Sequence, residues 1–307
     1  MLLLQVLGYL FLLVAAIAAS VSMNFQKLAA NQTLFEDPRT KLRRRAQPWT
    51  RPVYLRPLFV VAILLSAAAS TLDFLALAWL PASTVGVFGT LAIIINLAVT
   101  RIILFESPTP KEWLPIAYVI VGCVLAIATT PDESQHDKTV GQLIERTTSC
   151  VYIVLNWVVF ILASLWLEAR PMKGGFPFIA GALGAQNVCM GKYIAYACMT
   201  AEHGTLSVRV DNFVAALLLC VASVLVHIHW LNKGFASEDA YFCIIVYQTA
   251  WFIFTTLSGI VVYDNIAQLN DFAKCLFALG VCVATTGVFK VVKIHTSRLT
   301  QNADSER

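Results

Sequence analysis

Apolar runs of about 20 residues recur along nearly the whole chain, and this pattern constrains the fold more than any other feature. The nine runs lie at 2–27, 58–80, 81–104, 113–130, 148–168, 177–200, 210–232, 240–263 and 272–292. Each is long enough for a helix to cross the hydrocarbon core of a bilayer. The runs are continuous and do not alternate at every second residue, which favours helices over the strands of a membrane barrel. The sequence therefore predicts an all-α polytopic membrane bundle of about nine helices, forming a single membrane domain over 1–307.

The chain contains no recognisable catalytic motif. HExxH, GxSxG, a P-loop and paired intramembrane aspartates are all absent. The eight cysteines form no CxxC and lie mostly inside the apolar runs, so we interpret them as packing residues and not as a disulfide or metal framework. Only 13% of the residues are charged, against about 25% in a typical soluble domain. We predict neither enzymatic activity, nor a cofactor, nor a nucleic-acid partner.

Basic residues are distributed unevenly between alternate loops. Fifteen fall on one side of the predicted bundle and four on the other. The positive-inside rule then places the N-terminus outside, and the basic loop 31–57 and the tail 294–307 in the cytoplasm. The first run lacks the basic n-region of a signal peptide, so we expect it to remain as a helix. Arg43, Arg44 and Arg45 are candidate contacts for anionic lipid, although anchoring of the topology alone is an alternative.

The two halves of the chain show a weak internal similarity. Glu106 aligns with Asp264 and Gly122 aligns with Gly280, and both pairs differ by 158 in residue number. The paired helices lie an odd number of spans apart, so the two copies would point in opposite directions across the membrane. This pattern is typical of transporters built from inverted repeats. It predicts four spans in the first copy and five in the second.

Asp73 is the one full carboxylate inside the second run. It lies fifteen residues from the start of that run, roughly 22 Å along a helix. A charge at such a depth costs at least about 2.5 kcal/mol and normally faces a wet cavity or a partner. Small and polar side chains lie on the same helical stripe, namely Ala62, Ser66, Ala69, Ser70 and Ala76. Two interpretations are open: the stripe lines an ion pathway, or it packs tightly against another helix.

Lys192 is the only lysine well inside a run, at a depth similar to that of Asp73. It either pairs with Asp73 or faces a cavity alone. Further polar groups inside the runs are Asn96, Gln186, Asn187, Asn232 and Gln248, each of which can equally join helices by hydrogen bonds. Glu106 and Asp264 lie at opposite ends of their helices, where the mouths of a pathway would be. His227 and His229 lie on different helix faces, which argues against a metal site.

Several segments together resemble the NIPA-type magnesium transporter family, within the drug/metabolite transporter superfamily. They are "SMNFQK", "DFLALAWLPAST", "FGTLAIIIN", "LFES", "LGAQNVCMGK", "WLNKGF" and "FTT". The resemblance implies that Lys27, Lys192 and Asn232 occupy family positions. The family carries a glutamate and an asparagine in its second helix where this chain has Ser70 and Asp73. A family proline falls near Ile245. These departures leave the fold expectation intact and the ion selectivity open.

The resemblance implies a transporter of Mg²⁺ or other divalent cations in the plasma or endosomal membrane. As metal ligands we predict Asp73, Ser70 and Asn96. The predicted pathway or gating residues are Lys27, Glu106, Asn187, Lys192, Asn232, Gln248 and Asp264. A carrier of an organic or anionic solute and a non-transporting membrane scaffold remain alternatives. Coupling to protons and assembly into a homodimer are left open.

Overall fold

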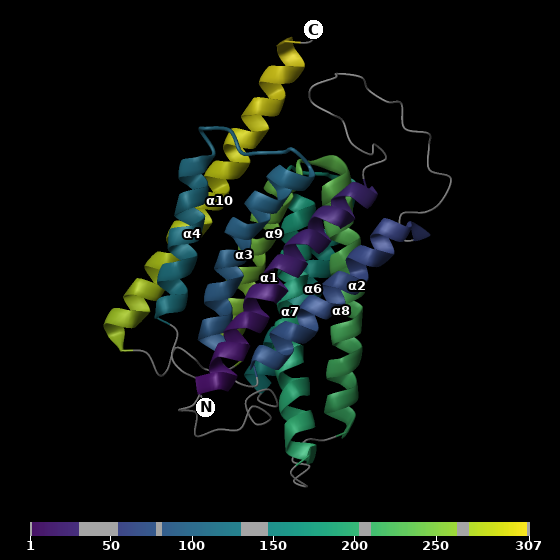
Figure 1. Cartoon of the computed structure of the whole chain (residues 1–307), viewed down its shortest axis with the longest axis vertical. Helices are drawn as coiled ribbons and strands as arrows, with labels where there is room; N and C mark the ends of the chain where they lie inside the picture. The colour runs from purple at the N-terminus through teal and green to yellow at the C-terminus, as the bar shows by residue number, and fades with distance from the viewer. Residues whose placement is uncertain are drawn as a thin grey trace.

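The computed structural model describes residues 2–30, 55–77, 82–129, 147–202, 210–262 and 270–305. Within these ranges it contains nine α-helices and no strand (Figure 1). The helices are α1 (Leu2–Ala30), α2 (Pro57–Leu77), α3 (Ala82–Ile103), α4 (Trp113–Ala128), α6 (Thr147–Ala169), α7 (Gly175–Glu202), α8 (Val210–Ser237), α9 (Ala240–Val261) and α10 (Asp271–Ser305). The predicted all-α membrane bundle is confirmed.

Five of these helices are long and apolar enough to cross a membrane: α1, α6, α8, α9 and α10. Shorter apolar helices cover Pro57–Asp73, Ala92–Ile103 and Trp113–Ala126. The remaining helix, α7, has 28 residues but carries Gln186, Asn187 and Lys192, so its composition is more polar. Residues 179–186 of α7 are buried, and a helix that faces protein does not need the apolar surface that lipid requires.

The last helix continues beyond the predicted membrane span. The tail 294–307 was expected to be a polar extension, but α10 runs on to Ser305 and projects past the rest of the bundle (Figure 1). Residues 293–305 contain neither proline nor glycine, so nothing in the sequence ends the helix where the apolar run ends.

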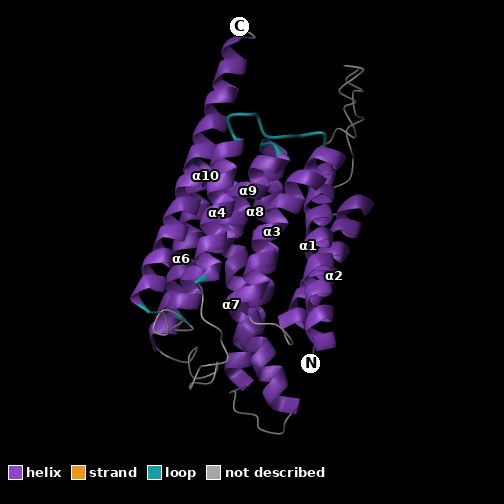
Figure 2. Ribbon diagram, turned by 60° about the vertical axis from the view of Figure 1, so that its left-hand side comes forward, coloured by secondary structure: helices purple, strands orange, loops and turns teal. Residues whose placement is uncertain are grey.

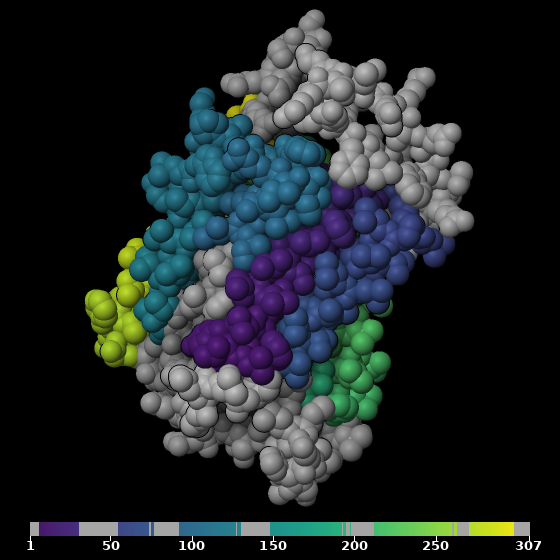
Figure 3. Space-filling model, in the orientation of Figure 1, coloured from purple at the N-terminus to yellow at the C-terminus, as the bar shows by residue number. Residues whose placement is uncertain are grey.

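The helices pack mainly as neighbouring pairs. α1 lies along α2, and α4 lies along α10 (Figures 2 and 3). α7 contacts both α8 and α9. Five helices also form a closed series of contacts in the order α1, α3, α9, α7, α8 and back to α1. We call these five helices the central ring. Two large apolar clusters support it, one joining α3 and α9 to α4 and α10, the other joining α7, α8 and α9 to α6.

The α4–α10 pair contains the two glycines that the internal similarity aligned. A Cβ added to Gly122 would lie 2.5 Å from the carbonyl oxygen of Gly280 and 2.3 Å from the nitrogen of Ala284. A Cβ added to Gly280 would lie 2.7 Å from the carbonyl oxygen of Gly122 and 2.6 Å from the nitrogen of Ala126. The contacts are reciprocal, as they are across a two-fold axis.

A second pair of matching contacts relates the halves. The hydroxyl of Ser22 on α1 donates to the carbonyl oxygen of Ala62 on α2, at 2.7 Å. The hydroxyl of Ser223 on α8 donates to the carbonyl oxygen of Leu183 on α7, at 2.6 Å. Residues 22 and 183 differ by 161, and so do 62 and 223. The same two positions are therefore bonded in each half, with donor and acceptor exchanged, which supports the inverted-repeat prediction.

Candidate functional site

The central ring contains a set of buried or half-buried side-chain amides whose oxygen atoms lack hydrogen-bond partners. Six of them have a buried oxygen with no partner among the residues that the structure describes: Asn24, Gln26, Asn96, Gln186, Asn187 and Asn232. We call this set the amide layer. It is distributed over α1, α3, α7 and α8, and the fifth ring helix, α9, adds the buried Gln248. At 1.5 Å per residue, the layer lies roughly 6 to 18 Å from one common end of the ring.

The unpartnered atoms are predominantly hydrogen-bond acceptors. Six amide oxygens lack a partner, but only two amide nitrogens do, those of Asn96 and Gln186. The NH₂ groups of Asn24 and Asn232 donate to carbonyl oxygens of their own helices, at 2.8 Å and 2.7 Å. These bonds fix the orientation of both amides, so their oxygens remain without a donor.

The unpartnered oxygens lower the stability of the fold unless a bound solute or water donates hydrogen bonds to them. A buried acceptor without a donor destabilises a protein by about 1 to 3 kcal/mol. Amides that only joined helices would be paired with a neighbouring helix, whereas Asn96 is 1% exposed and neither of its polar atoms is bonded. Buried polar groups of this kind indicate a place where a solute or water is bound.

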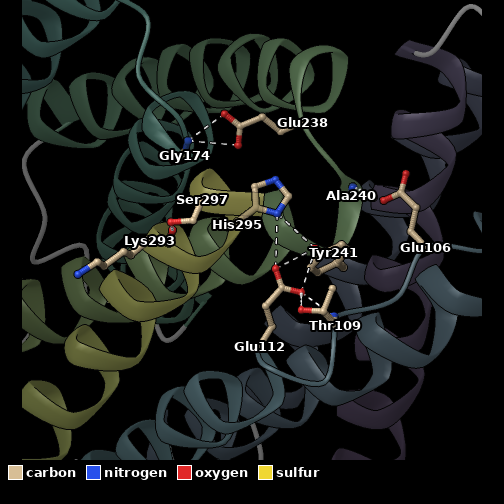
Figure 4. A network of polar contacts seen from close by, with 10 residues as sticks. All are labelled: Glu106, Thr109, Glu112, Gly174, Glu238, Ala240, Tyr241, Lys293, His295 and Ser297. Carbon is tan, nitrogen blue, oxygen red and sulfur yellow. Dashed lines mark hydrogen bonds and ion pairs between the residues drawn. The ribbon is translucent and has the colours of Figure 1, made fainter. Parts of the chain in front are cut away.

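Polar contacts join the helices at the end of the ring nearest the amide layer, and we call this set of contacts the end cap. Figure 4 shows its three carboxylates, Glu106, Glu112 and Glu238, with their partners. The ammonium group of Lys27, near the end of α1, donates to the carbonyl oxygens of Phe235 and Glu238 at the end of α8. The carboxylate of Glu238 accepts from the backbone N–H of Gly174 at 2.9 Å, just before α7. Three ring helices are thereby tied together at one end.

The end cap extends to α4, α9 and α10. Glu106 accepts from the backbone N–H of Ala240 at the start of α9. Glu112 accepts from the hydroxyl of Tyr241 at 3.1 Å and lies 3.6 Å from Nδ1 of His295 on α10. Glu112, Tyr241 and His295 are all at most 2% exposed. The cap therefore joins the helices at this end through charged and hydrogen-bonded groups, beside the buried apolar side chains of Phe235 and Phe242.

Two cap carboxyls hold their protons more tightly than free glutamic acid. Burial raises the pKa of Glu106 and of Glu238 above the ordinary 4.5, although Lys27 and the backbone donors oppose this shift. The folded protein therefore binds protons that the unfolded chain releases. The stability from these two groups is present below pH 4.5 and is lost as the pH rises through their raised pKa values.

A double replacement tests this pH dependence. Between pH 4.5 and neutral pH, we expect the melting temperature of the wild type to fall by a few degrees relative to that of Glu106→Gln/Glu238→Gln. Differential scanning fluorimetry in detergent measures both curves. The control is Glu168→Gln, because Glu168 is 48% exposed and pairs with Lys233 at the surface. Parallel curves for the wild type and the double variant would contradict the prediction.

The predicted metal ligands lie on two helices, Ser70 and Asp73 on α2 and Asn96 on α3. Asp73 is partly buried on α2, which packs on α1, while Ser70 on the same helix is exposed. Asn96 is buried on α3 within the amide layer. Asp73 lies near the end of α2 that is remote from the cap, whereas Asn96 lies toward the cap. The three residues are not shown to form one ligand set.

Of the predicted pathway residues, Asn187, Asn232 and Gln248 lie in or beside the amide layer, and Glu106 and Lys27 belong to the end cap. The backbone of Lys192 lies in α7, but its side chain is outside the described part of the structure, and so is Asp264. Pairing of Lys192 with Asp73 therefore stays a prediction. Arg43, Arg44 and Arg45 also lie outside the described residues.

Several site residues were not predicted from the sequence. The amides of Asn24 and Gln26 were missed because they lie at the polar end of the first run. Glu112, Glu238, Tyr241 and His295 were missed because charged residues beside a membrane span are usually solvated. A signal was present for Glu238, because α8 ends at Ser237 and α9 begins at Ala240, so Glu238 must lie close to the bundle.

Comparisons with known proteins identify relatives across nearly the whole chain. The sequence profile of the family described as "Magnesium transporter NIPA" matches residues 3–297. "Probable magnesium transporter NIPA8" of Arabidopsis thaliana is 19% identical over 260 residues, covering 78% of this chain and 58% of that protein. "NIPA-like protein 2" of Mus musculus is 20% identical over 293 residues, covering 93% and 73% respectively.

A third relative, "Probable magnesium transporter NIPA6" of Arabidopsis thaliana, is 24% identical over 210 residues and is covered over 63% of its length. The chain thus spans less than two thirds of both Arabidopsis relatives. No solved structure matches the chain.

Proposed function

The chain belongs to the family of NIPA magnesium transporters, and from this premise we propose that it moves Mg²⁺ across a membrane. Membership places it among membrane transporters and not among enzymes. The choice of ion is our inference, because the three curated relatives described above are 19 to 24% identical and this chain departs from the family pattern at Ser70 and Asp73.

The observation that carries the proposal is the excess of acceptors in the amide layer. Oxygen atoms are the ligands and the hydrogen-bond acceptors that Mg²⁺ and its bound waters prefer. An anionic solute would need donors instead, and only two amide nitrogens of the layer are unpartnered. The layer therefore favours a hydrated cation over the anion expected of an organic-solute carrier.

Two further features of the structure suggest where the ion enters the protein and where its passage is closed. We propose that Asp73, the only acid on α2, attracts the cation near the end remote from the cap. We further propose that the end cap closes the other end and opens for release. A membrane potential favours inward movement of two charges by about 4.6 kcal/mol per 100 mV, so no nucleotide site is required.

Orientation and location follow from the charge distribution of the sequence. We propose that the protein resides in the plasma or endosomal membrane. In this membrane the N-terminus faces away from the cytoplasm, and the end cap and the C-terminal part of α10 face the cytoplasm. In this orientation Arg43, Arg44 and Arg45 would lie beside the anionic inner leaflet.

Uptake into proteoliposomes tests the proposal. Purified full-length protein is reconstituted with an entrapped Mg²⁺ indicator, and uptake of Mg²⁺ is compared with that of organic anions at the same membrane potential. We expect Mg²⁺ uptake that falls at least about tenfold in Asp73→Asn, the loss corresponding to about 1.4 kcal/mol of ion binding. Asp271→Asn is the matched control, because Asp271 is 97% exposed at the start of α10.

The outcomes separate the three candidate functions. Uptake of anions without Mg²⁺ would indicate the organic-solute carrier. Absence of any flux, with a folded protein in the vesicles, would indicate the scaffold.

A further inference from the structure

We propose that the amide layer binds the cation with its inner shell of water intact. In this arrangement the bound waters donate hydrogen bonds to the amide oxygens, and no side-chain oxygen contacts the metal. This inference rests on the proposed transport of Mg²⁺ and specifies how the layer recognises the ion.

The first argument is the absence of carboxylates from the layer. The sequences of α1, α3 and α9 contain no aspartate or glutamate. α7 and α8 contain one each, Glu202 and Asp211, both at the ends remote from the cap. Mg²⁺ releases water reluctantly, and proteins that contact it directly normally supply one or two carboxylates. Neutral amides do not replace the lost hydration, so the ion keeps its waters at this depth.

The second argument is the chemistry of the unpartnered atoms. Six buried amide oxygens are without a donor. The waters around Mg²⁺ are arranged octahedrally and direct their hydrogens outward, so a hydrated ion presents many donors and no acceptors. A bare ion would satisfy oxygens by direct contact, but it would require them to converge within about 2.1 Å of one point. Gln26 is set aside here, because its amide donates to Ser22 on the side of α1 that faces α2. The other five oxygens lie on four helices and over roughly 10 Å of depth, a spread that suits the larger hydrated ion better than a bare ion.

The third argument is that Gln186 and Asn96 each have a buried oxygen and a buried nitrogen that both lack partners. Both side chains are at most 1% exposed, and they lie on different ring helices. An amide with free donor and acceptor atoms can bond to a water molecule in either orientation, which allows the hydrated ion to rotate as it passes. Discrimination among divalent cations would then depend on the size and strength of the hydration shell.

Hexaamminecobalt(III) is the probe that distinguishes hydrated from direct binding. The complex resembles hydrated Mg²⁺ in size, in octahedral shape and in its outward N–H donors, but it does not exchange its ligands. In proteoliposomes of neutral phosphatidylcholine, we expect the complex to inhibit Mg²⁺ uptake with an inhibition constant within about tenfold of the Michaelis constant for Mg²⁺. The larger tris(ethylenediamine)cobalt(III), of equal charge, should inhibit more weakly.

A variant supplies an independent measurement. Asn96→Asp places a carboxylate in the layer and should permit direct contact with the metal. We expect its Mg²⁺ uptake to be at least about tenfold less sensitive to hexaamminecobalt(III) than that of the wild type.

The possible results distinguish a failure of hydrated binding from a failure of Mg²⁺ transport itself. Mg²⁺ uptake that the complex does not inhibit would overturn hydrated binding while leaving Mg²⁺ transport in place. Equal inhibition by both cobalt complexes would show an effect of charge alone and would also overturn it. Absence of Mg²⁺ uptake would overturn the proposed function itself, and hydrated binding with it.

Discussion

Replacing Gly122 with alanine should destabilise the bundle by about 3 kcal/mol or more, a larger effect than most single substitutions produce. The new Cβ would lie 2.3 Å from the backbone nitrogen of Ala284, a distance at which one of the two helices must move. Backbone atoms cannot rotate away as the end of a side chain can. The α4–α10 pair would therefore separate along its length, and the large apolar cluster beside it would lose contacts.

Gly280→Ala should have a similar effect, because its contacts with Gly122 and Ala126 are reciprocal. Gly191→Ala is the matched control: a Cβ at Gly191 has no atom within 4 Å, and alanine is the better helix former by about 1 kcal/mol. Thermal unfolding in detergent, followed by size-exclusion fluorescence, measures all three variants. Equal melting temperatures for Gly122→Ala and Gly191→Ala would show that α4 and α10 do not approach this closely.

The helical bundle could be predicted because each apolar run corresponds closely to one helix. Eight of the nine predicted runs end within five residues of the observed helices. The end of α10 could not be placed, because a polar helix outside the bilayer has no apolar signal. The pairing of Gly122 with Gly280 was visible as a sequence similarity, but their contact required the two helices to be placed side by side.

The candidate site was predictable only in part. The sequence shows that Asn96 lies inside an apolar run, but not whether a neighbouring helix supplies a partner for its amide. The end cap depends on contacts between residues far apart in the chain, such as Lys27 with Phe235 and Glu112 with His295. Such contacts follow from the packing of helices and leave no local pattern in the sequence.

Asn96→Leu should change stability and transport in opposite directions. Leucine has the same branched shape as asparagine, with methyl groups in place of two buried polar atoms that have no partner, so the free energy of unfolding should rise by about 1 to 3 kcal/mol. Mg²⁺ uptake should fall at least about tenfold, because a hydrogen bond to a charged species contributes about 1.5 to 3 kcal/mol. If Asn96 only joined helices, the same replacement would lower the free energy of unfolding of the protein.

The matched control is Asn156→Leu on α6, outside the central ring. The NH₂ group of Asn156 donates to the carbonyl oxygen of Tyr152 at 2.8 Å, so its amide is already partnered. We expect this variant to keep its Mg²⁺ uptake and to gain no more than a few tenths of a kcal/mol in stability. Thermal unfolding and proteoliposome uptake, measured on the same preparations, give both quantities. An Asn96→Leu protein that is less stable than the wild type, or that transports Mg²⁺ at the wild-type rate, would remove the amide layer from the mechanism.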